Sequence, residues 1–145
     1  MAKFNFRLQT YLNLKAKIED QKRNEFGKAV AALELEKTKL VNLQQERNDC
    51  IDEFRKKVES TIEPGGINRY NLYLDVLKKR IAEQKSRVAR AEAFLRAKRA
   101  ELVEAMKNRK ILETLKEKDF ETYLIEEKKN EQKIVDDLIS YKYSK

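Results

Sequence analysis

The stretch Glu63-Pro64-Gly65-Gly66-Ile67-Asn68 interrupts an otherwise helix-forming sequence of 145 residues. Pro64 is the single proline of the chain, and the remaining glycine outside the stretch is Gly27. Proline stops a helix, glycine suits the position after a helix end, and Asn68 is suited to cap the next helix. We therefore expect one helix from about residue 4 to about residue 60, a turn at about 61–68 and a second helix from about 69 to about 141, forming one domain over residues 1–145.

The composition favours long helices over a thick globular core. Charged residues make up 40% of the chain, the mean hydropathy is −0.81, and there is no tryptophan. Alanine, glutamate, lysine, leucine, arginine and glutamine, all strong helix formers, dominate. A disordered chain is the alternative for so much charge. The apolar residues argue against disorder because they recur at helical spacing.

A seven-residue repeat runs through the second half of the chain. Its positions alternate four and three residues apart, which is the pattern of a coiled coil. The expected seam residues of this helix, meaning those that face a partner helix, are Tyr70, Leu74, Leu77, Ile81, Gln84, Val88, Ala91, Leu95, Lys98, Leu102, Ala105, Arg109 and Leu112. Beyond them the repeat is expected to drift, to Leu115, Phe120, Leu124, Ile134, Leu138 and Tyr141.

The first half carries a less regular stripe of apolar residues. Its members are Phe26, Val30, Leu33, Leu40, Ile51, Phe54 and Val58, with Lys37, Gln44 and Arg47 in the gaps. An earlier stripe of Leu8, Tyr11, Lys15 and Ile18 is out of phase with it. This difference predicts a local change of supercoil near Lys22.

A short connection makes the two helices antiparallel neighbours, so we expect an all-α antiparallel coiled-coil hairpin. Folding about Gly65 pairs residues whose numbers sum to about 129. Phe54 then faces Leu74, and Arg47 lies near Gln84. About 20 C-terminal residues are left without an intrachain partner, because the first helix is the shorter one. The apolar residues there are candidates for binding another molecule.

The sequence offers no catalytic or metal-binding constellation. There is no histidine, so the usual general base and the commonest metal ligand are missing. Cys50 is the single cysteine and is expected to be a buried structural thiol beside the seam. No glycine-rich phosphate loop occurs. We expect no enzyme activity, no cofactor and no metal.

The net charge of +8 is concentrated in one part of the chain. Residues 78–112 carry twelve basic and four acidic residues, whereas 1–77 have a net charge of +2 and 113–145 of −2. Such a surface favours an acidic protein, a nucleic acid or a lipid headgroup, and a solvated helix face is the alternative. Interspersed acids and the lone aromatic Phe94 argue against nucleic acid. The basic belt comprises Lys78, Lys79, Arg80, Arg87, Arg90, Arg96 and Arg99.

Three features predict a soluble cytoplasmic protein that does not span a membrane. No run of about 18 apolar residues occurs. The N-terminus has no apolar region of the kind that secretion signals need. The lone cysteine is typical of a reducing compartment.

The N-terminal sequence resembles a known family. Phe4-Asn5-Phe6-Arg7-Leu8-Gln9-Thr10-Tyr11-Leu12-Asn13-Leu14-Lys15 is similar to the opening of the flagellar FliJ protein family, small proteins of flagellar type III export that begin with an F-x-F-x-L-Q-x-L-L-x-L-K/R pattern. Tyr11 stands where leucine is common. The C-terminal third resembles the closing pattern of the family through Arg109, Leu112-Glu113, Leu115, Tyr123, Glu131-Gln132-Lys133 and Asp136-Asp137. The resemblance covers essentially the whole chain.

The resemblance implies a function in protein export. Members form an antiparallel coiled coil similar to the two terminal helices of the rotary ATP synthase stalk subunit. The joined ends of the chain would enter the pore of the hexameric flagellar export ATPase and promote its assembly or activity. Contacts with the membrane export gate protein and with export chaperones are also implied. The protein would then lie peripherally at the inner face of the cell membrane, at the flagellar base.

Under this resemblance, two groups of residues are candidate contact sites. For the export ATPase they are Phe4, Phe6, Leu8, Ile134, Leu138 and Tyr141. For the export gate they are Tyr70, Tyr73 and Leu74, although Tyr70 and Phe54 also fit as seam residues. An unrelated structural or regulatory coiled-coil adaptor and a stalk homologue of injectisomes are the alternatives. The hairpin interpretation expects a monomer in isolation.

Overall fold

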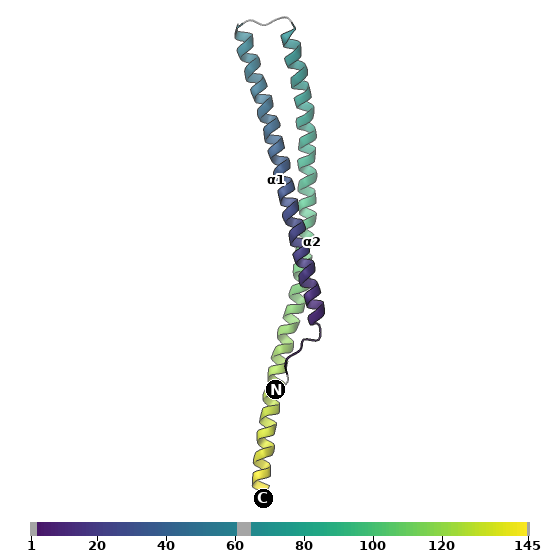
Figure 1. Cartoon of the computed structure of the whole chain (residues 1–145), viewed down its shortest axis with the longest axis vertical. Coiled ribbons are helices and arrows are strands. Elements are labelled where there is room, and N and C mark those ends of the chain that lie inside the picture. The colour runs from purple at the N-terminus through teal and green to yellow at the C-terminus, as the bar shows by residue number, and fades with distance from the viewer. Residues whose placement is uncertain (1–2, 61–64, 145) are drawn as a thin grey trace. The chain divides into compact units, whose positions relative to one another are not determined.

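The computed structural model describes residues 3–60 and 65–144 of the chain. Two helices, α1 (Gln9–Ser60) and α2 (Gly66–Ser144), make up nearly all of it, and no strand occurs among these residues. They run antiparallel and pack against each other, which confirms the all-α coiled-coil hairpin (Figure 1). Of the turn expected at about 61–68, residues 61–64 lie outside the described residues.

The helix ends differ from those expected. Helix α1 begins at Gln9, five residues late, because the preceding residues follow α2 in a non-helical conformation. Helix α2 begins at Gly66, three residues early, so Asn68 lies inside the first turn and does not cap it. The amide of Arg69 donates to the carbonyl oxygen of Gly65 at 3.4 Å, the first bond of the helical pattern. Gly65 therefore occupies the capping position.

The contacts divide the chain into two units. One unit comprises the residues up to Lys22 together with those from Leu102 onwards, and the other is Arg23–Glu101. Each unit contains one part of α1 packed against one part of α2, so each has its own stretch of seam. The two are described separately below.

The expected seam of α2 is confirmed. All thirteen predicted positions from Tyr70 to Leu112 are buried or half-buried, and Leu77 is fully buried. Their neighbours on the outer face are exposed. The repeat does not drift after Leu112 as expected, because Lys116, Asp119 and Tyr123 continue it and are half-buried.

The expected phase shift in α1 is wrong. A single uninterrupted repeat of thirteen positions runs along the helix, and every one of them is buried or half-buried. The prediction failed because it followed apolar residues, whereas charged residues fill several seam positions. Tyr11, Val30, Lys37 and Val58 are exposed instead. The seam comprises Leu12, Lys15, Glu19, Lys22, Phe26, Ala29, Leu33, Glu36, Leu40, Leu43, Arg47, Cys50 and Phe54.

The register between the helices also differs from the expected one. The ring of Phe54 lies 5.2 Å from that of Tyr70, four residues before the expected partner Leu74. Gln84 meets Glu36 and not Arg47. Phe54, Glu36 and Glu25 of α1 thus contact lower-numbered residues of α2 than predicted, whereas Glu19 contacts Arg109, within one residue of the predicted position.

Within the described residues, neither α1 nor α2 contains a stretch that is both long enough and apolar enough to cross a bilayer.

Candidate functional site

The N-terminal segment before α1 runs beside α2 (Figure 1). It packs onto this helix through alternate side chains. Phe6 is 7% exposed and forms a cluster with Leu12 of α1 and Leu112 of α2, against which Phe4 and Leu8 pack. The intervening Lys3, Asn5 and Arg7 are exposed. A period of two is typical of non-helical, strand-like chain and not of a helix. Phe4, Phe6 and Leu8 are thus core-forming in the hairpin itself.

An aromatic cluster extends this packing towards the C-terminus. The ring of Phe4 lies 5.2 Å from that of Phe120, edge-on, and 5.4 Å from that of Tyr123. Phe120 and Tyr123 are themselves 6.2 Å apart and stacked. Edge-to-face and offset aromatic pairs add roughly 0.5–1.5 kcal/mol beyond the area they bury. The cluster holds Phe4 against the part of α2 that contains Phe120 and Tyr123.

The last part of α2 presents an exposed apolar face. Among the described residues, every residue from 128 to 144 is exposed. Ile134, Leu138 and Tyr141 follow one another at spacings of four and three and are 60%, 63% and 62% exposed. Val135 flanks this stripe, and Ile139 lies one turn beyond Val135, whereas Lys129, Gln132 and Asp136 fall on the opposite side of the helix. A continuous stripe of exposed apolar side chains is typical of a protein-binding site.

Charged layers cross the seam in both units. In the first, the Arg109 guanidinium binds the buried Glu19 of α1 through Nε and Glu113 of α2 through Nη1 at 2.7 Å. These partners raise the pKa of Arg109, the Glu19 hydrogen bond being the main cause. In the second, Lys98 Nζ lies 3.1 Å from Glu101 and 3.4 Å from Glu25 of α1.

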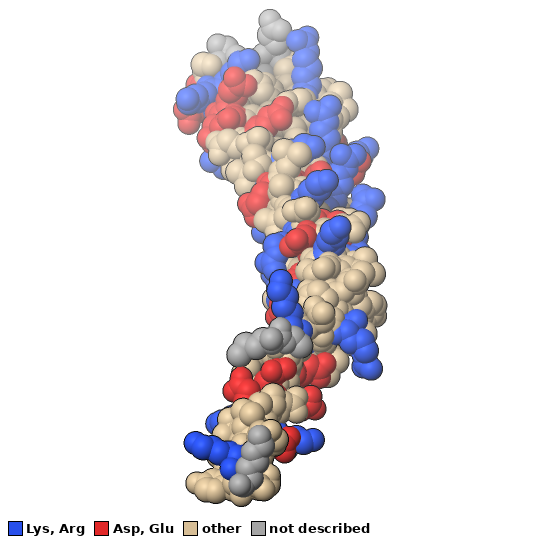
Figure 2. All heavy atoms as spheres, turned by 60° about the horizontal axis from the view of Figure 1, so that its bottom comes forward, with Lys and Arg blue, Asp and Glu red and all other residues tan. Residues whose placement is uncertain are grey.

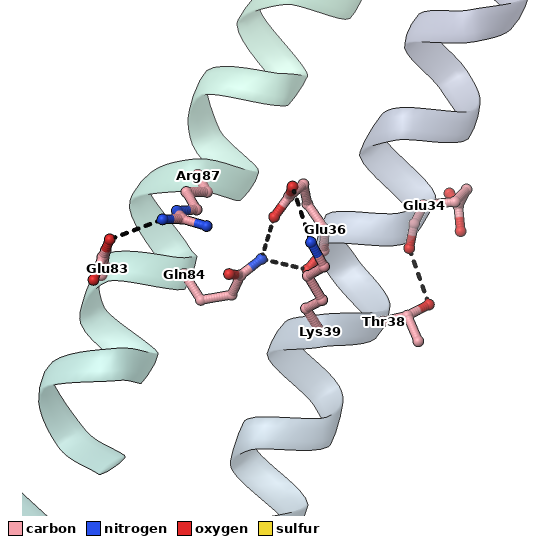
Figure 3. A network of polar contacts seen from close by, with 7 residues as sticks. All are labelled: Glu34, Glu36, Thr38, Lys39, Glu83, Gln84 and Arg87. Atoms are coloured by element: carbon pink, nitrogen blue, oxygen red, sulfur yellow. Dashed lines mark hydrogen bonds and ion pairs between the residues drawn. The ribbon is translucent and has the colours of Figure 1, made fainter. Parts of the chain in front are cut away.

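A further polar layer lies between α1 and α2 in the unit Arg23–Glu101 (Figure 3). The side-chain amide of the buried Gln84 donates to the carbonyl oxygen of Glu36 at 2.9 Å and also to its carboxylate. Lys39 lies 3.9 Å from the same carboxylate. The free-energy cost of burying polar groups is small only when they hydrogen-bond to each other. Because a shift of one helix along the other would break these bonds, such layers specify the alignment of the helices.

The candidate residues for contact with the export gate, Tyr70, Tyr73 and Leu74, lie in the first turns of α2. Tyr70 packs on Phe54, and Lys57 Nζ lies 5.5 Å above its ring. Tyr70 is therefore half-buried in the seam, as its spacing predicts. Tyr73 is partly exposed, and its hydroxyl donates to the Glu46 carboxylate, which raises the pKa of Tyr73. Leu74 is half-buried and lines a groove with Ile51 and Ile81.

The residues of the basic belt are exposed on α2. In Figure 2 blue side chains cluster on the upper right, where α2 runs, while red ones are frequent on the α1 side. Arg87 pairs with Glu83 of its own helix at 3.0 Å, and the Arg99 guanidinium lies 5.7 Å above the Phe26 ring. The full belt of exposed side chains is Lys78, Lys79, Arg80, Arg87, Arg90, Arg96 and Arg99.

Two observations bear on chemistry within the described part of the chain. No group of three or more cysteine, aspartate or glutamate side chains is arranged to hold a metal ion there. Cys50 is buried at a seam position, as expected, and burial together with Glu53 and Glu46 raises the pKa of its thiol. A thiol with a raised pKa is a poor nucleophile.

Sequence reasoning missed the aromatic partners of Phe4 and the charged seam of α1. The alternation of Phe4, Phe6 and Leu8 carried the first signal, because apolar residues two apart are not a helical pattern. The second signal was the regular spacing of Lys15, Glu19 and Lys22, which continues the heptad through charged residues.

The comparisons with known proteins agree with this architecture. A family model described as Flagellar FliJ protein matches residues 4–145. A search of curated proteins by sequence finds no match. Among solved structures, a chain from Chlamydia trachomatis described as a YscO homologue is similar, with a TM-score of 0.59 and 21% identity. The match covers 94% of this chain and 93% of that one, and at this identity it supports the fold alone.

Proposed function

We propose a function for this chain from the premise that it belongs to the flagellar FliJ protein family, whose model spans residues 4–145. The chain is accordingly a component of type III export. We infer that it is non-enzymatic, works in flagellar protein export in the cytoplasm, and associates peripherally with the inner face of the cell membrane. Family membership favours this function over an unrelated coiled-coil adaptor.

The central proposal is that the hairpin binds the hexameric export ATPase and promotes its assembly or activity. The observation that carries it is the exposed apolar stripe of Ile134, Leu138 and Tyr141. A soluble protein rarely exposes a continuous apolar face unless another molecule covers it. The similarity of the family to the terminal helices of the rotary ATPase stalk points to the axial pore of the ring as the place where this stripe is covered.

Phe4, Phe6 and Leu8 support binding indirectly. Phe6 is almost fully buried, so we propose that these residues hold the N-terminal segment and the Phe120–Tyr123 region in place for the ATPase contact. Replacing them disturbs packing as well as any contact with a partner. The C-terminal stripe is consequently the better place for a test.

The gate and chaperone contacts belong to other surfaces. Tyr73 and Leu74, beside the seam residue Tyr70, keep accessible area near the start of α2 and are proposed to face the membrane export gate protein. The basic belt is proposed to meet acidic surface on the gate or on export chaperones, because opposite charges speed and orient encounters. The uncharged, largely apolar side chains of Tyr73 and Leu74 would give the gate contact an apolar centre.

The test is hydrolysis of ATP by the flagellar export ATPase of the same organism, titrated with this protein. We expect stimulation that saturates at roughly one hairpin per hexamer, as an axial position requires. The double variant Ile134→Ser/Leu138→Ser should lose at least about tenfold in apparent affinity, about 1.4 kcal/mol. The matched variant Lys129→Ser/Asp136→Ser changes exposed residues on the opposite side of the same helix and should stimulate like the wild type. Equal stimulation by both variants would reject the stripe as the contact.

A further inference from the structure

A groove runs between α1 and α2 in the unit Arg23–Glu101. It includes Leu74 and Lys78, which the proposed function assigns to contacts with the export gate or chaperones. Its volume is about 520 Å³. Apolar side chains from both helices form the floor, namely Ile51 from α1 with Leu74 and Ile81 from α2. Ile81 is buried, and the other two are half-buried.

The spacing of residues on α2 explains why the groove is open. Lys78, Ala82 and Lys85 follow each other at intervals of four and three, so they lie on one face beside the seam. The methyl group of Ala82 is too small to cover the floor. The two lysines have long stems that border it and carry their charges outwards. Two packed helices leave such flanking positions exposed to solvent. A third helix packed alongside the seam would cover them.

The border of the groove is strongly basic. Arg47, Lys78 and Lys85 line it, against a single carboxylate, that of Asp75. Within residues 3–60 and 65–144, none of the three basic side chains forms an ion pair. An apolar floor with cations along its edges is complementary to a ligand that has an apolar face with carboxylates along its edges. A nucleic acid would leave the apolar floor without a partner.

We propose that this groove binds an amphipathic helix of a partner protein that carries carboxylates along both edges of its apolar face. The apolar face would cover Ile51, Leu74 and Ile81, and the carboxylates would lie near Arg47, Lys78 and Lys85. Binding of an amphipathic helix in an apolar groove is a common mode of peptide recognition. The proposal shares Leu74 and Lys78 with the proposed gate and chaperone contacts, and it does not depend on binding of the ATPase.

The probe for the test is a designed, fluorescently labelled helical peptide with leucine on one face and glutamate along both edges of it. Binding to the full chain is followed by fluorescence anisotropy. The groove variant Lys78→Glu/Lys85→Glu should weaken binding at least about tenfold. The control Lys79→Glu/Arg90→Glu makes the same change of net charge on exposed residues that do not line the groove, and it should weaken binding less than about twofold.

A second peptide of the same composition, with its leucines scattered around the helix, separates groove binding from attraction of charge. It should bind the wild-type chain at least about tenfold more weakly. Equal binding of both peptides, or equal loss in both double variants, would overturn the proposal. Circular dichroism shows whether the variants keep their helicity, and Lys78→Gln/Lys85→Gln provides a milder variant that should still weaken binding several-fold.

Other occupants of the groove give different results. Sedimentation equilibrium that detects a dimer of the wild-type chain, lost in the groove variant, would assign the groove to a second copy and reject the partner helix. Binding to phosphatidylglycerol vesicles that competes with the peptide and is lost in the same variant would assign it to a lipid surface, and would equally reject the proposal.

Discussion

Arg109 of α2 forms an ion pair across the seam with Glu19 of α1, whose exposed fraction is only 4%. The same guanidinium binds Glu113 one turn further along α2, so one cation is shared by two carboxylates. Burying a carboxylate to this extent is costly, and the ion pair with Arg109 offsets part of that cost.

Replacing Arg109 by methionine should therefore destabilise the hairpin and lower the urea concentration at which half of it is unfolded, because the buried Glu19 carboxylate loses this cation. Equilibrium unfolding by urea, followed by circular dichroism, measures this. The double variant Glu19→Leu/Arg109→Met should recover most of the loss, since the buried carboxylate is removed together with its cation. A double variant no more stable than Arg109→Met would contradict this account of the layer.

Phe6 provides a test of the N-terminal packing. Phe6→Ala removes a buried ring from the cluster with Leu12 and Leu112, and we expect a loss of about 3 kcal/mol in the free energy of unfolding. Asn5→Ala changes the neighbouring exposed position and should alter stability by less than about 0.5 kcal/mol. Similar losses in the two variants would show that the alternation of buried and exposed residues has been assigned wrongly.

The stability of the hairpin should fall at alkaline pH. The Tyr73 hydroxyl donates to Glu46, which raises its pKa above the ordinary value of 10.0. The folded chain therefore holds this proton more tightly than the unfolded chain, so the contribution is complete below about pH 10 and is lost as pH rises through the folded pKa. Burial likewise raises the pKa of Cys50 above its ordinary value of 9.0. The hydrogen bond with Glu101 raises the pKa of Lys98, so both groups contribute stability that is lost as pH rises.

Thermal unfolding measured at several pH values from 8 to 11 checks this sign. The melting temperature should decrease from about pH 9 upwards. Tyr73→Phe should make the decrease shallower above about pH 10, whereas Tyr143→Phe, at a highly exposed position, should leave the slope unchanged. A melting temperature that rises over this range would be incompatible with the three raised pKa values.

The exposed C-terminal stripe should contribute little to folding. Ile134→Ser/Leu138→Ser removes two side chains that are more than half exposed, so the free energy of unfolding should change by less than about 0.5 kcal/mol. Urea unfolding measures the change. A large loss of stability would mean that the stripe packs within the hairpin, and the same variant would then be unsuitable for testing ATPase binding.

The sequence was sufficient to predict the hairpin and the seam of α2. Both depend on strong local signals, the Pro64–Gly66 break and a heptad filled mostly by leucine, isoleucine, valine and alanine. Spacing alone identified even its polar members Gln84, Lys98 and Arg109, all of which are covered. The exposed stripe of Ile134, Leu138 and Tyr141 could be predicted as well, because α2 is longer than α1.

The seam of α1 and the conformation of residues 3–8 could not be predicted by the same reasoning. Glu19 and Glu36 occupy seam positions because α2 supplies Arg109 and Gln84 opposite them, which is information held in the other half of the chain. Likewise, Phe4 leaves the helical conformation because Phe120 and Tyr123 offer a better site for its ring. In both cases tertiary contacts decided between local alternatives.

The charged seam of α1 has a consequence for self-recognition. If two copies of α1 paired in parallel and in register, Lys15 would meet Lys15, Glu19 would meet Glu19 and Lys22 would meet Lys22. Like charges placed opposite each other at covered positions are strongly unfavourable, whereas opposite α2 the same glutamate finds Arg109. The charges that align α1 with its own α2 thus also discriminate against a homodimer of α1.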